Sequence, residues 1–365
     1  MSATTATITQ YFTELVQIDS PSGSEQQVAQ YLLAWLERNG FSHKQDEIGN
    51  LYASRNCNQS SVEPLLLCAH MDTVQPGVGI VPVVQEGYFQ SAGDTILGAD
   101  DKASVAAIMV AVEKMLTTKS GQEKALELLF TVKEETGGGV EHFPFEWITS
   151  KRAIVCDLAR PIGALGIGSP FIINFRINIR GKAAHASQPD IGKNAFIGLQ
   201  KILQAIEVGN LDDGMTTINI GTLKGGTTIN TIPELCELAG EVRSFREDLY
   251  STHLASIQKV ALQVEKDTGL LIDFSTDGYC PGYLYELDSP WVLEVGKVLH
   301  DSIKRPVSYE KSFGVSDANI LAAEGITTVV LSDGVMNAHT VHEKVALADM
   351  VMLCKVVENV LQATH

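Results

Sequence analysis

The sequence predicts an α/β fold with a mainly parallel sheet, into which an α+β module with the order βαββαβ is inserted. Between residues 51 and 157, short apolar runs alternate with helical patterns and short connections, which is typical of an α/β layer. From Phe171 to Arg180, apolar and polar residues alternate instead, as in an antiparallel strand with one solvated face. From Pro290 onward, helix and apolar strand alternate again, so we expect the chain to return to the first domain.

Length and charge limit the classes of protein that the chain can represent. At 365 residues it is too long for one ordinary core, so two domains are expected. An apolar fraction of 45% and a charged fraction of 19% are typical of a soluble globular protein. The formal net charge of -17 argues against nucleic acid or an anionic membrane as a partner.

The sequence also bears on the cellular compartment. The N-terminal residues show no basic region followed by an apolar core, and no apolar run approaches the ~20 residues of a membrane span. The six cysteines are scattered without C-x-x-C spacing. Cys68 and Cys156 stand in apolar runs, which suits buried free thiols better than disulfides. We therefore expect a cytoplasmic protein.

Local signals place the elements of the first domain. Ser22-Gly-Ser-Glu25 resembles a capping box, with Ser24 and Gln27 as a second possible register, and the helix behind it is expected to stop at Asn39-Gly40. Five apolar residues after Pro64 predict a short strand that is buried on both faces. Further expected elements are strands at 51–55, 81–84, 126–132, 153–156 and 327–331, a helix that begins at 98, and a final helix from near Ala346.

The inserted module is expected to fold by itself. Its strands are predicted at 171–179, 216–223, 235–245 and 270–275, with one helix after the first strand and one after the third. Four strands and two helices in this order form a self-contained, ferredoxin-like unit. The expected domains are 1–169 for the first part of the α/β domain, 170–285 for the insertion and 286–365 for the second part.

A histidine and an aspartate stand where the buried strand 65–69 ends. In open α/β sheets, ligands collect at the carboxyl ends of the strands, so His70 and Asp72 occupy a position suited to chemistry. A metal-binding imidazole usually donates its other N–H group to a carboxylate or carbonyl, and His-x-Asp can supply both parts. Taken alone, the pair also fits a core histidine beside a turn aspartate.

Further acidic and histidine clusters follow at strand ends or helix starts. They are Asp100/Asp101, Glu134/Glu135, Asp157, and His339 with His342 and Glu343. Taken singly they indicate a helix N-cap, a solvated turn or a turn residue. Together they would place several carboxylates around one sheet edge, where mutual repulsion is severe unless cations are present. Mixed imidazole and carboxylate ligands suit zinc, with cobalt or manganese as substitutes.

The order of these motifs resembles that of a known family. His70-x-Asp72, Gly98-Ala-Asp-Asp-Lys102, Glu134-Glu135, Asp157 and His339-x-x-x-Glu343 look like the dizinc exopeptidase family of peptidase T, carboxypeptidase G, aminoacylase and succinyl-diaminopimelate desuccinylase. In the insertion, Arg180-Gly-Lys-Ala-Ala-His185-Ala and Gly225-Gly-Thr-Thr-Ile-Asn230-Thr-Ile-Pro233 resemble signatures of the family's lid domain. Glu241-Val-Arg243-Ser-Phe245 is similar as well, and it looks closest to the peptidase T-like branch. The resemblance covers nearly the whole chain.

The resemblance implies a site with two Zn²⁺ ions. His70 and Asp157 would bind one zinc, Glu135 and His339 would bind the other, and Asp100 would bridge them. Asp72 would orient His70, and Glu134 would be the general base toward a water that the two cations activate. His342 competes with His339, and His339 is preferred because the family's ligand lies four residues before the glutamate.

The resemblance also implies roles for the insertion. In dimeric members, the histidine that matches His185 reaches the active site of the other subunit and stabilises the tetrahedral oxyanion, so a homodimer formed through the lid is expected. Asn230 and Arg243 match positions that hold carboxylate or carbonyl groups of the substrate. Two departures concern the pocket: Val315 replaces the second glycine of the family's Gly-Gly-Thr-Asp loop, and Leu158-Ala-Arg160 follows Asp157.

The leading hypothesis is a zinc-dependent exopeptidase that hydrolyses short peptides, as a tripeptide aminopeptidase does. An amidohydrolase or carboxypeptidase that acts on N-acyl amino acids would use the same metals and base, so it stays open. A relative that binds metal without catalysis is a third alternative, and the presence of Glu134 argues against it because a structural site needs no unligated base. No P-loop or Gly-x-Gly-x-x-Gly pattern supports nucleotide binding.

Overall fold

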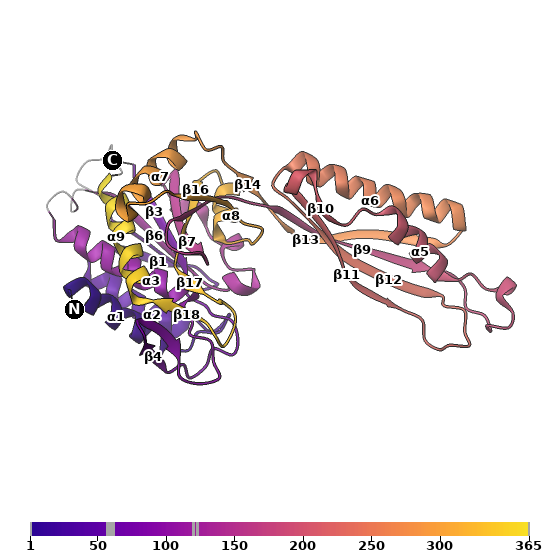
Figure 1. Cartoon of the computed structure of the whole chain (residues 1–365), viewed down its shortest axis with the longest axis horizontal. Coiled ribbons are helices and arrows are strands. Elements are labelled where there is room, and N and C mark those ends of the chain that lie inside the picture. Colours follow the sequence, from indigo (N-terminus) through magenta and orange to yellow (C-terminus); the bar gives the residue numbers. More distant parts are fainter. Residues whose placement is uncertain (1, 56–62, 119–120, 122–123, 364–365) are drawn as a thin grey trace. The chain divides into compact units, whose positions relative to one another are not determined.

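The chain divides into two compact units in a computed structural model, which describes residues 2–55, 63–118, 121 and 124–363 (Figure 1). Unit 1 comprises Met1–Ile167 and Tyr285–His365, and unit 2 comprises Gly168–Leu284. Unit 2 is one continuous segment, whereas unit 1 is assembled from the two parts of the chain that flank it.

A mixed sheet forms the centre of unit 1. Its strands follow the order β1-β2-β6-β3-β7-β16-β8-β14, and β15 pairs with β8. The four central strands, β6, β3, β7 and β16, are mutually parallel, and the strands on both sides of them are antiparallel. In the same order, the bounds are β1 (Ser42–Gln45), β2 (Leu51–Arg55), β6 (Leu126–Thr131), β3 (Leu65–His70), β7 (Arg152–Leu158), β16 (Thr327–Ser332), β8 (Ala164–Ser169), β14 (Tyr283–Leu284) and β15 (Ser308–Lys311). The predicted mainly parallel α/β core is therefore confirmed.

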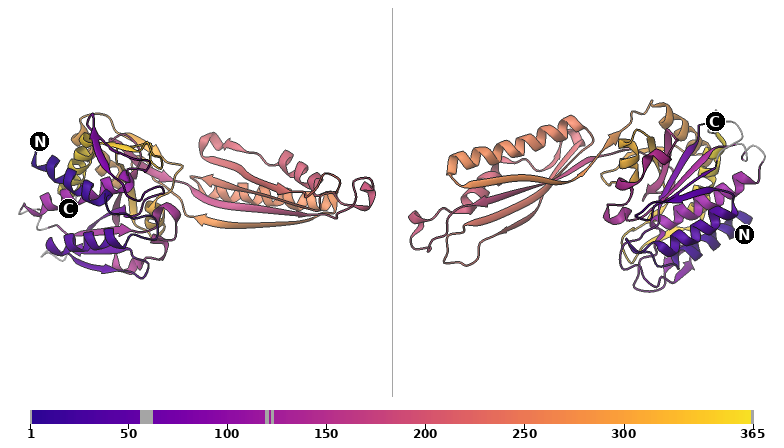
Figure 2. Two further views of the ribbon diagram at one scale, coloured as in Figure 1. Left: turned by 90° about the horizontal axis from the view of Figure 1, so that it is seen from below. Right: turned by 180° about the vertical axis from the view of Figure 1, so that it is seen from behind.

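Helices cover both faces of this sheet (Figure 2). The helices of unit 1 are α1 (Ala3–Val16), α2 (Gln26–Arg38), α3 (Ala99–Leu116), α7 (Pro290–Ile303), α8 (Asp317–Ala323) and α9 (Leu347–Ala363). Helix α3 packs against α1, α9 and the central strands, while α8 packs against β7 and β16. All six residues of β3 are buried, so the apolar run was correctly predicted to be buried on both faces.

Short elements complete unit 1 around the carboxyl ends of the strands. A small antiparallel sheet has the order β17 (Val335–Met336), β18 (Lys344–Ala346), β5 (Tyr88–Ser91) and β4 (Pro82–Gln85). Three 3-10 turns follow β6, namely η1 (Glu134–Thr136), η2 (Val140–His142) and η3 (Phe145–Trp147). Of the acidic and histidine residues predicted from the sequence, Glu134 and Glu135 lie in η1, and His339 lies in the loop between β17 and β18.

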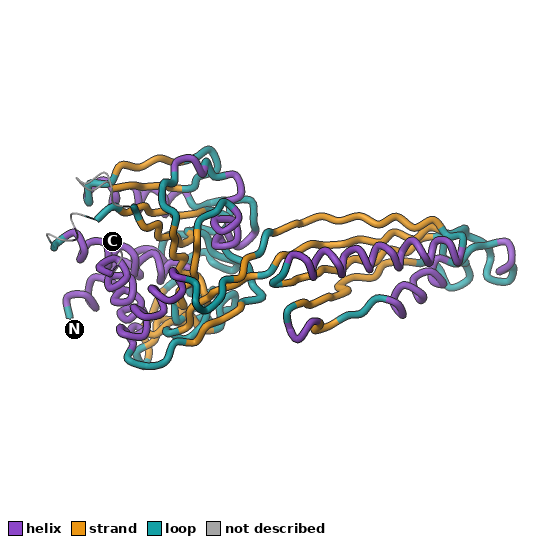
Figure 3. Tube along the Cα trace, turned by 90° about the horizontal axis from the view of Figure 1, so that it is seen from above, coloured by secondary structure: helices purple, strands orange, loops and turns teal. Residues whose placement is uncertain are grey.

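Unit 2 is an antiparallel sheet with both of its α-helices on one face (Figure 3). The strands follow the order β10 (Gly209–Leu211), β11 (Thr216–Gly225), β12 (Leu235–Ser244), β9 (Phe171–Arg180) and β13 (Leu271–Cys280). The helices are α5 (Ala195–Ala205) and α6 (Glu247–Thr268), and two 3-10 turns are η4 (Pro189–Ile191) and η5 (Asp212–Gly214). Apart from the short β10, this is the predicted βαββαβ order with ferredoxin-like pairing.

The alternation in β9 explains the single covered face. Phe175, Ile177 and Ile179 are buried against the two helices, whereas Asn174 and Arg180 point to the open face and are exposed. Five cysteines in the described part of the chain are free thiols, as expected for Cys68 and Cys156, and Cys57 lies outside the described residues. Among the described helices, none has the length and apolar character that a membrane span requires.

Candidate metal centre and active site

His70 ends strand β3 with its ring fixed in one orientation. Its Nδ1 lies 3.0 Å from the backbone oxygen of Asp72 and 3.4 Å from Oδ1 of the same residue. Its Nε2 lies 3.2 Å from Oδ1 of Asp100. The ring is buried, so the contacts of Nδ1 leave Nε2 as the atom presented to the neighbouring carboxylates.

Asp72 joins three segments of the chain beneath His70. The Ser22 hydroxyl donates a hydrogen bond to Oδ2 at 2.6 Å, and the backbone N–H groups of Glu134 and Glu135 donate at 3.0 and 3.2 Å. Burial opposes ionisation of this carboxyl, but the hydrogen bonds from His70 and Ser22 outweigh it and lower the pKa of Asp72. One carboxylate therefore holds both the imidazole and the backbone of the Glu134–Glu135 pair.

The prediction of a capping box is wrong in both registers, at Ser22 and at Ser24. Helix α2 begins at Gln26 behind Glu25, and no side chain caps it. The Ser22 hydroxyl is bound to Asp72, and Oε1 of Glu25 accepts the N–H groups of Gly23 at 2.7 Å and Lys133 at 3.1 Å. The two polar side chains of the motif thus stabilise the site rather than the helix terminus.

Glu134 and Glu135 lie in η1, just beyond the end of β6. Lys133 has a φ of 55°, in the left-handed region that non-glycine residues seldom adopt, and this bend leads directly into the pair. Oε2 of Glu135 lies 2.9 Å from Nε2 of His339. Burial raises the pKa of Glu134 well above its usual range, and the nearby Asp157 raises it further.

Asp100 stands between the two histidines at the start of α3. Its Oδ1 lies 3.2 Å from Nε2 of His70, and its Oδ2 lies 3.3 Å from Nε2 of His339. Glu343 fixes this turn, because Oε1 accepts the N–H of Asp100 at 2.9 Å while Oε2 accepts those of Leu97 and Gly98 at 2.8 Å. Burial raises the pKa of Glu343 to about 6 despite these three donors.

His339 reaches the cluster from the loop between β17 and β18. Its φ is 64°, and its side chain is 54% exposed although Nε2 contacts both Asp100 and Glu135. The hydrogen bonds to Asp100 and Glu135 raise the pKa of His339 to about 10. His342 is exposed, and its backbone oxygen accepts a hydrogen bond from the side chain of Asn337. Between the two candidates, His339 is the one that contacts the acidic residues.

Asp157 lies inside β7 rather than after it, because the strand runs on to Leu158. Burial, together with the nearby Asp100, raises the pKa of Asp157 to about 8. Three groups in the described chain have ligand atoms within 4.8 Å of one another: His70 with Asp100 and Glu135, His70 with Glu134 and Asp157, and Asp100 with Asp157 and Asp333. The structure therefore brings the seven predicted residues of unit 1 together.

The sequence-based reasoning missed Asp333 and the part played by Ser22. Asp333 directly follows the apolar run of β16, just as the predicted residues follow other apolar strands, so the same rule applied to residue 333 would have found it. Burial raises its pKa well above the usual range, with Asp100 adding to the shift. No local signal marks the contact of Ser22 with Asp72, since the two residues lie 50 positions apart.

The chemistry of these residues fits divalent cations. Two imidazoles and several carboxylates converge, and their charges cannot all be retained at this depth without a compensating cation. Within the described residues, three buried carboxylate oxygens have no hydrogen-bond partner, namely Asp101 Oδ1, Glu135 Oε1 and Asp333 Oδ2. Buried polar atoms normally have a hydrogen-bond partner. Carboxylate oxygens that lack one are therefore expected where a cation would be their partner.

The three predicted residues of the insertion lie in unit 2. His185 and Asn230 are exposed neighbours, because the N–H of Ala186 donates to the oxygen of Asn230 at 2.9 Å. Nδ1 of His185 lies 2.8 Å from the Ser187 hydroxyl. Arg243 is near the other end of β12, where Nε and Nη2 donate to the Glu241 carboxylate at 2.9 and 3.0 Å. At roughly 3.3 Å per residue, about 26 Å of strand separates Leu235 from Arg243.

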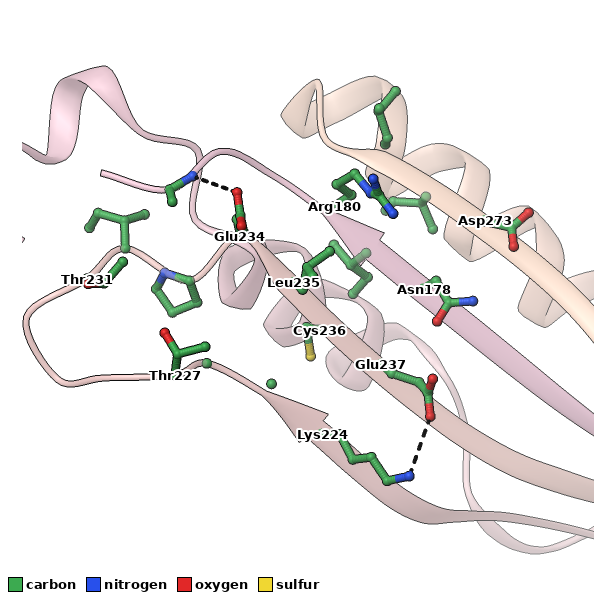
Figure 4. A pocket seen from close by; sticks show the side chains of 18 of the residues that line it. Asn178, Arg180, Lys224, Thr227, Thr231, Glu234, Leu235, Cys236, Glu237 and Asp273 are labelled. Carbon is green, nitrogen blue, oxygen red and sulfur yellow. Dashed lines mark hydrogen bonds and ion pairs between the residues drawn. The ribbon is translucent and has the colours of Figure 1, made fainter. Parts of the chain in front are cut away.

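Unit 2 also contains a hollow of about 830 Å³, which Thr227 and Thr231 help to line (Figure 4). Its lining mixes charges of both signs with apolar side chains, and it includes Arg180, Lys224, Glu237 and Asp273. The Lys224 ammonium lies 4.0 Å from Oε1 of Glu237. All the residues that line this hollow belong to unit 2, and none of the clustered residues of unit 1 is among them.

The site gathers imidazoles and carboxylates at the carboxyl edge of a parallel sheet, and the chain carries an inserted ferredoxin-like unit. This combination is typical of metal-dependent hydrolases. The chain belongs to the peptidase family M20/M25/M40, whose sequence model matches residues 66–363. It is accordingly a hydrolase of peptide bonds, and the resemblance drawn from its motifs is confirmed.

Relatives and solved structures agree with this assignment. The uncharacterized protein YqjE of Bacillus subtilis (strain 168) is 31% identical over 361 residues, covering 96% of each chain. Aminopeptidase PepT from Bacillus cereus ATCC 10987 superposes with a TM-score of 0.93 at 30% identity, over 99% of this chain and 98% of that one. A tripeptidase from Staphylococcus aureus has a TM-score of 0.89 at 28% identity, with the same coverage. A probable carboxypeptidase of Aspergillus clavatus is 31% identical over 255 residues, 63% of this chain and 60% of that one.

Proposed function

We propose that the protein is a dizinc aminopeptidase that removes the N-terminal residue from short peptides, tripeptides in particular. The observation that carries the proposal is Asp100, whose two oxygens face Nε2 of His70 and Nε2 of His339 at 3.2 and 3.3 Å. A carboxylate between two imidazoles is suited to bridging two cations. The likeness to PepT and to the staphylococcal tripeptidase supports the substrate class.

Each predicted ligand has a place in this proposal. His70 and Asp157 would hold one cation, Glu135 and His339 would hold the other, and Asp100 would contact both. Zinc is proposed because imidazole and carboxylate donors in small number suit it, with Co²⁺ or Mn²⁺ as substitutes. When bound, the two ions would lower the pKa of a water and polarise the scissile carbonyl.

Glu134 is proposed as the general base and acid. It lies in the cluster beside His70 and Asp157, and its backbone N–H is fixed by Asp72. From that position its carboxylate accepts a proton from the attacking water and returns it to the leaving amine, so the proton count balances over one turnover. Asp72 is a positioning residue, because it orients His70 and Glu134 through hydrogen bonds and through the backbone.

A homodimer formed through unit 2 is part of the proposal. His185 and Asn230 lie near one end of β12 and Arg243 near the other, so one small substrate cannot contact all three residues of the same chain. A second subunit that contributes His185 and Asn230 removes this conflict. Exposed apolar side chains on α5, Phe196, Ile197 and Leu203, give such a dimer a surface to bury.

The surroundings of the enzyme belong to the same proposal. A cytoplasmic location agrees with the free thiols of Cys68, Cys156, Cys236, Cys280 and Cys354. With a net charge of -17, neither nucleic acid nor an anionic membrane is proposed as a partner. The expected partners are a short peptide substrate and a second copy of the chain.

A carboxypeptidase or N-acyl amino acid amidohydrolase is the second candidate. The matching probable carboxypeptidase favours it, and the clustered residues of unit 1 would serve either reaction. The difference would lie in which terminus of the substrate must be free. Arg243 is a candidate for holding a substrate carboxylate, since a guanidinium binds one bidentately, as it binds Glu241 here.

The test is hydrolysis of a paired substrate panel by zinc-loaded protein. The panel contains free tripeptides, the same tripeptides N-acetylated, and N-acyl amino acids, with Glu134→Gln as the control. Cleavage of the free tripeptides alone, reduced about 100-fold or more in the variant, supports the aminopeptidase. Cleavage of the acylated substrates would transfer the assignment to the second candidate. Equal inactivity of both proteins with two zinc ions bound would favour a binding protein without catalysis.

A further inference from the structure

Asp333 reaches the candidate metal centre from a strand that the predicted ligand set does not use. Strand β16 lies parallel to β7, with Ser332 beside Leu158. The N–H of Asp333 donates to the backbone oxygen of Leu158 at 3.2 Å, which extends the pairing past the end of β16. Asp333 therefore lies next to the part of β7 that carries Asp157.

The two carboxylate oxygens of Asp333 have different surroundings. Oδ1 accepts a hydrogen bond from the N–H of Val335 at 2.8 Å. Oδ2 is buried and has no hydrogen-bond partner among the residues that the structure describes. A ligand atom of Asp333 lies within 4.8 Å of ligand atoms of both Asp100 and Asp157, and the side chain is completely buried.

A purely structural role explains only half of this arrangement. Capping the turn at Val335 needs one acceptor, which Oδ1 supplies and which an uncharged serine or asparagine would also supply. This capping role leaves Oδ2 of Asp333 without a hydrogen-bond donor and buried beside the carboxylates of Asp100 and Asp157. Such an arrangement costs free energy through desolvation and repulsion. A cation within reach of Asp100, Asp157 and Asp333 offsets both costs.

We propose that Asp333 is a further metal-binding residue, whose Oδ2 is an additional oxygen donor to the cation held by Asp100 and Asp157. The inference rests on the proposed dinuclear metal centre and adds a fourth side chain, after His70, Asp100 and Asp157, to one of its two positions. Three carboxylates and one imidazole make this position richer in oxygen than the other. Oxygen-rich sites suit Mn²⁺, so this position is expected to take Mn²⁺ more readily.

The test compares Asp333→Asn with the wild-type protein after each apoprotein is loaded with Co²⁺ or Mn²⁺. Asparagine keeps the acceptor for Val335 and replaces Oδ2 with an amide nitrogen that has no lone pair to donate. We expect Mn²⁺ binding, followed by its electron paramagnetic resonance signal, to weaken about tenfold or more at one of two sites. The visible bands of the cobalt protein should intensify, because the ion loses a donor.

Two further variants control the experiment. Asp333→Ser also keeps an acceptor for Val335, and it replaces Asp333→Asn if the latter does not fold. Glu127→Gln alters another buried carboxylate, which accepts from Tyr52, Thr149 and Ser150 and lies outside the three clusters. It should leave metal binding and the cobalt spectrum unchanged.

The outcomes separate this inference from the proposed function. If the wild-type protein binds two ions and the Asp333 variants have the same cobalt spectrum as the wild type, Asp333 is not a ligand. The proposed metal centre is still supported in that case. If wild-type protein binds no ion, the proposed function itself fails. Weaker Mn²⁺ binding together with the altered cobalt spectrum supports Asp333 as a ligand.

Discussion

The Ser22 hydroxyl lies 2.6 Å from Oδ2 of Asp72, the carboxylate whose other oxygen is 3.4 Å from Nδ1 of His70. A loop near the N-terminus is thereby linked to the imidazole at the end of β3. Asp72 also accepts the N–H groups of Glu134 and Glu135. Loss of the Ser22 hydroxyl is therefore expected to disturb the proposed base, Glu134, and the predicted ligands His70 and Glu135 together.

Replacing Ser22 by alanine is expected to weaken metal binding and to lower kcat/KM, each by about tenfold. This is the lower end of the range of about 10- to 100-fold that is typical when a residue supporting a metal ligand is lost. The variant should lose about 1 to 2 kcal/mol of stability, because a hydrogen bond to a buried charge is removed. Zinc titration, kinetics and denaturant unfolding measure the three effects. Ser24→Ala, at an exposed neighbour, is the matched control, and equal behaviour of the two variants would contradict this role for Ser22.

Replacing Glu343 by glutamine should disturb Asp100. The amide has one acceptor oxygen where the carboxylate uses two to bind the N–H groups of Leu97, Gly98 and Asp100. A loss of about 1 to 3 kcal/mol is expected in chemical unfolding, since a buried donor is left unpaired. Glu141→Gln provides the control, because its exposed carboxylate also accepts a backbone N–H and should change stability by less than about 0.5 kcal/mol.

A mixture of two inactive variants tests the proposed dimer. His185→Ala and Arg243→Ala are each expected to lower activity strongly. If every site uses its own Arg243 and the His185 of the other chain, a mixed dimer contains one complete site. Random exchange of subunits would then restore roughly a quarter of wild-type activity. No recovery after verified subunit exchange would show that the two residues do not act across the dimer.

Stability at high pH should depend on Tyr11. Its hydroxyl donates to Oε1 of Glu113 at 2.6 Å, and burial together with this carboxylate raises the pKa of Tyr11 to about 12 from the ordinary 10.0. Below pH 10 both folded and unfolded chains keep the proton, so the stabilisation is fully present. Between pH 10 and 12 only the unfolded chain loses it, so stability falls as the pH rises.

Tyr11→Phe removes both the bond and the titration. The variant should be about 1 to 2 kcal/mol less stable at neutral pH, and its stability should fall less steeply between pH 10 and 12. Urea unfolding at several pH values measures both quantities. Tyr309→Phe, at a tyrosine that is 39% exposed, is the comparison, and the same slope in all three proteins would refute the role of Tyr11.

Chelation should lower the thermal stability of unit 1. A ligand present at a thousandfold excess over its Kd stabilises the folded state by about 4 kcal/mol, so removing bound metal is expected to lower Tm by roughly 10 °C. Calorimetry with and without a chelator measures the shift, and added zinc should reverse it. An unchanged Tm in wild-type protein would indicate that the acidic cluster is not a metal site.

Much of the architecture could be predicted because it depends on local patterns. Continuous apolar runs indicated the parallel strands, and strict alternation in 171–180 indicated a sheet with one covered face. The clustering of His70, Glu134 and Asp157 followed from one geometric rule, that parallel strands bring their carboxyl ends to one edge. Asp157 nevertheless lies within its strand, since β7 continues past the apolar run.

The remaining features depend on tertiary contacts that no local pattern contains. Ser22 carries a capping signature, but a charged acceptor 50 residues away binds its hydroxyl more strongly than a helix terminus would. Asp333 follows β16, a position that marked other residues of the site, but the glycine after it gives it the appearance of an ordinary turn residue. Its relation to Asp157 appears only when β16 is known to lie beside β7.

The position of β16 has a consequence for synthesis of the protein on the ribosome. This strand lies between β7 and β8, which end by Ser169 at the start of unit 2, whereas β16 begins at Thr327, after unit 2. A nascent chain therefore lacks an internal strand of the sheet until more than a hundred residues after β8 have been added. His339 follows β16 along the chain. If His339 is a metal ligand as proposed, a ribosome-bound chain that has not yet reached this segment lacks one ligand, and we expect it to be inactive until residue 339 has been added.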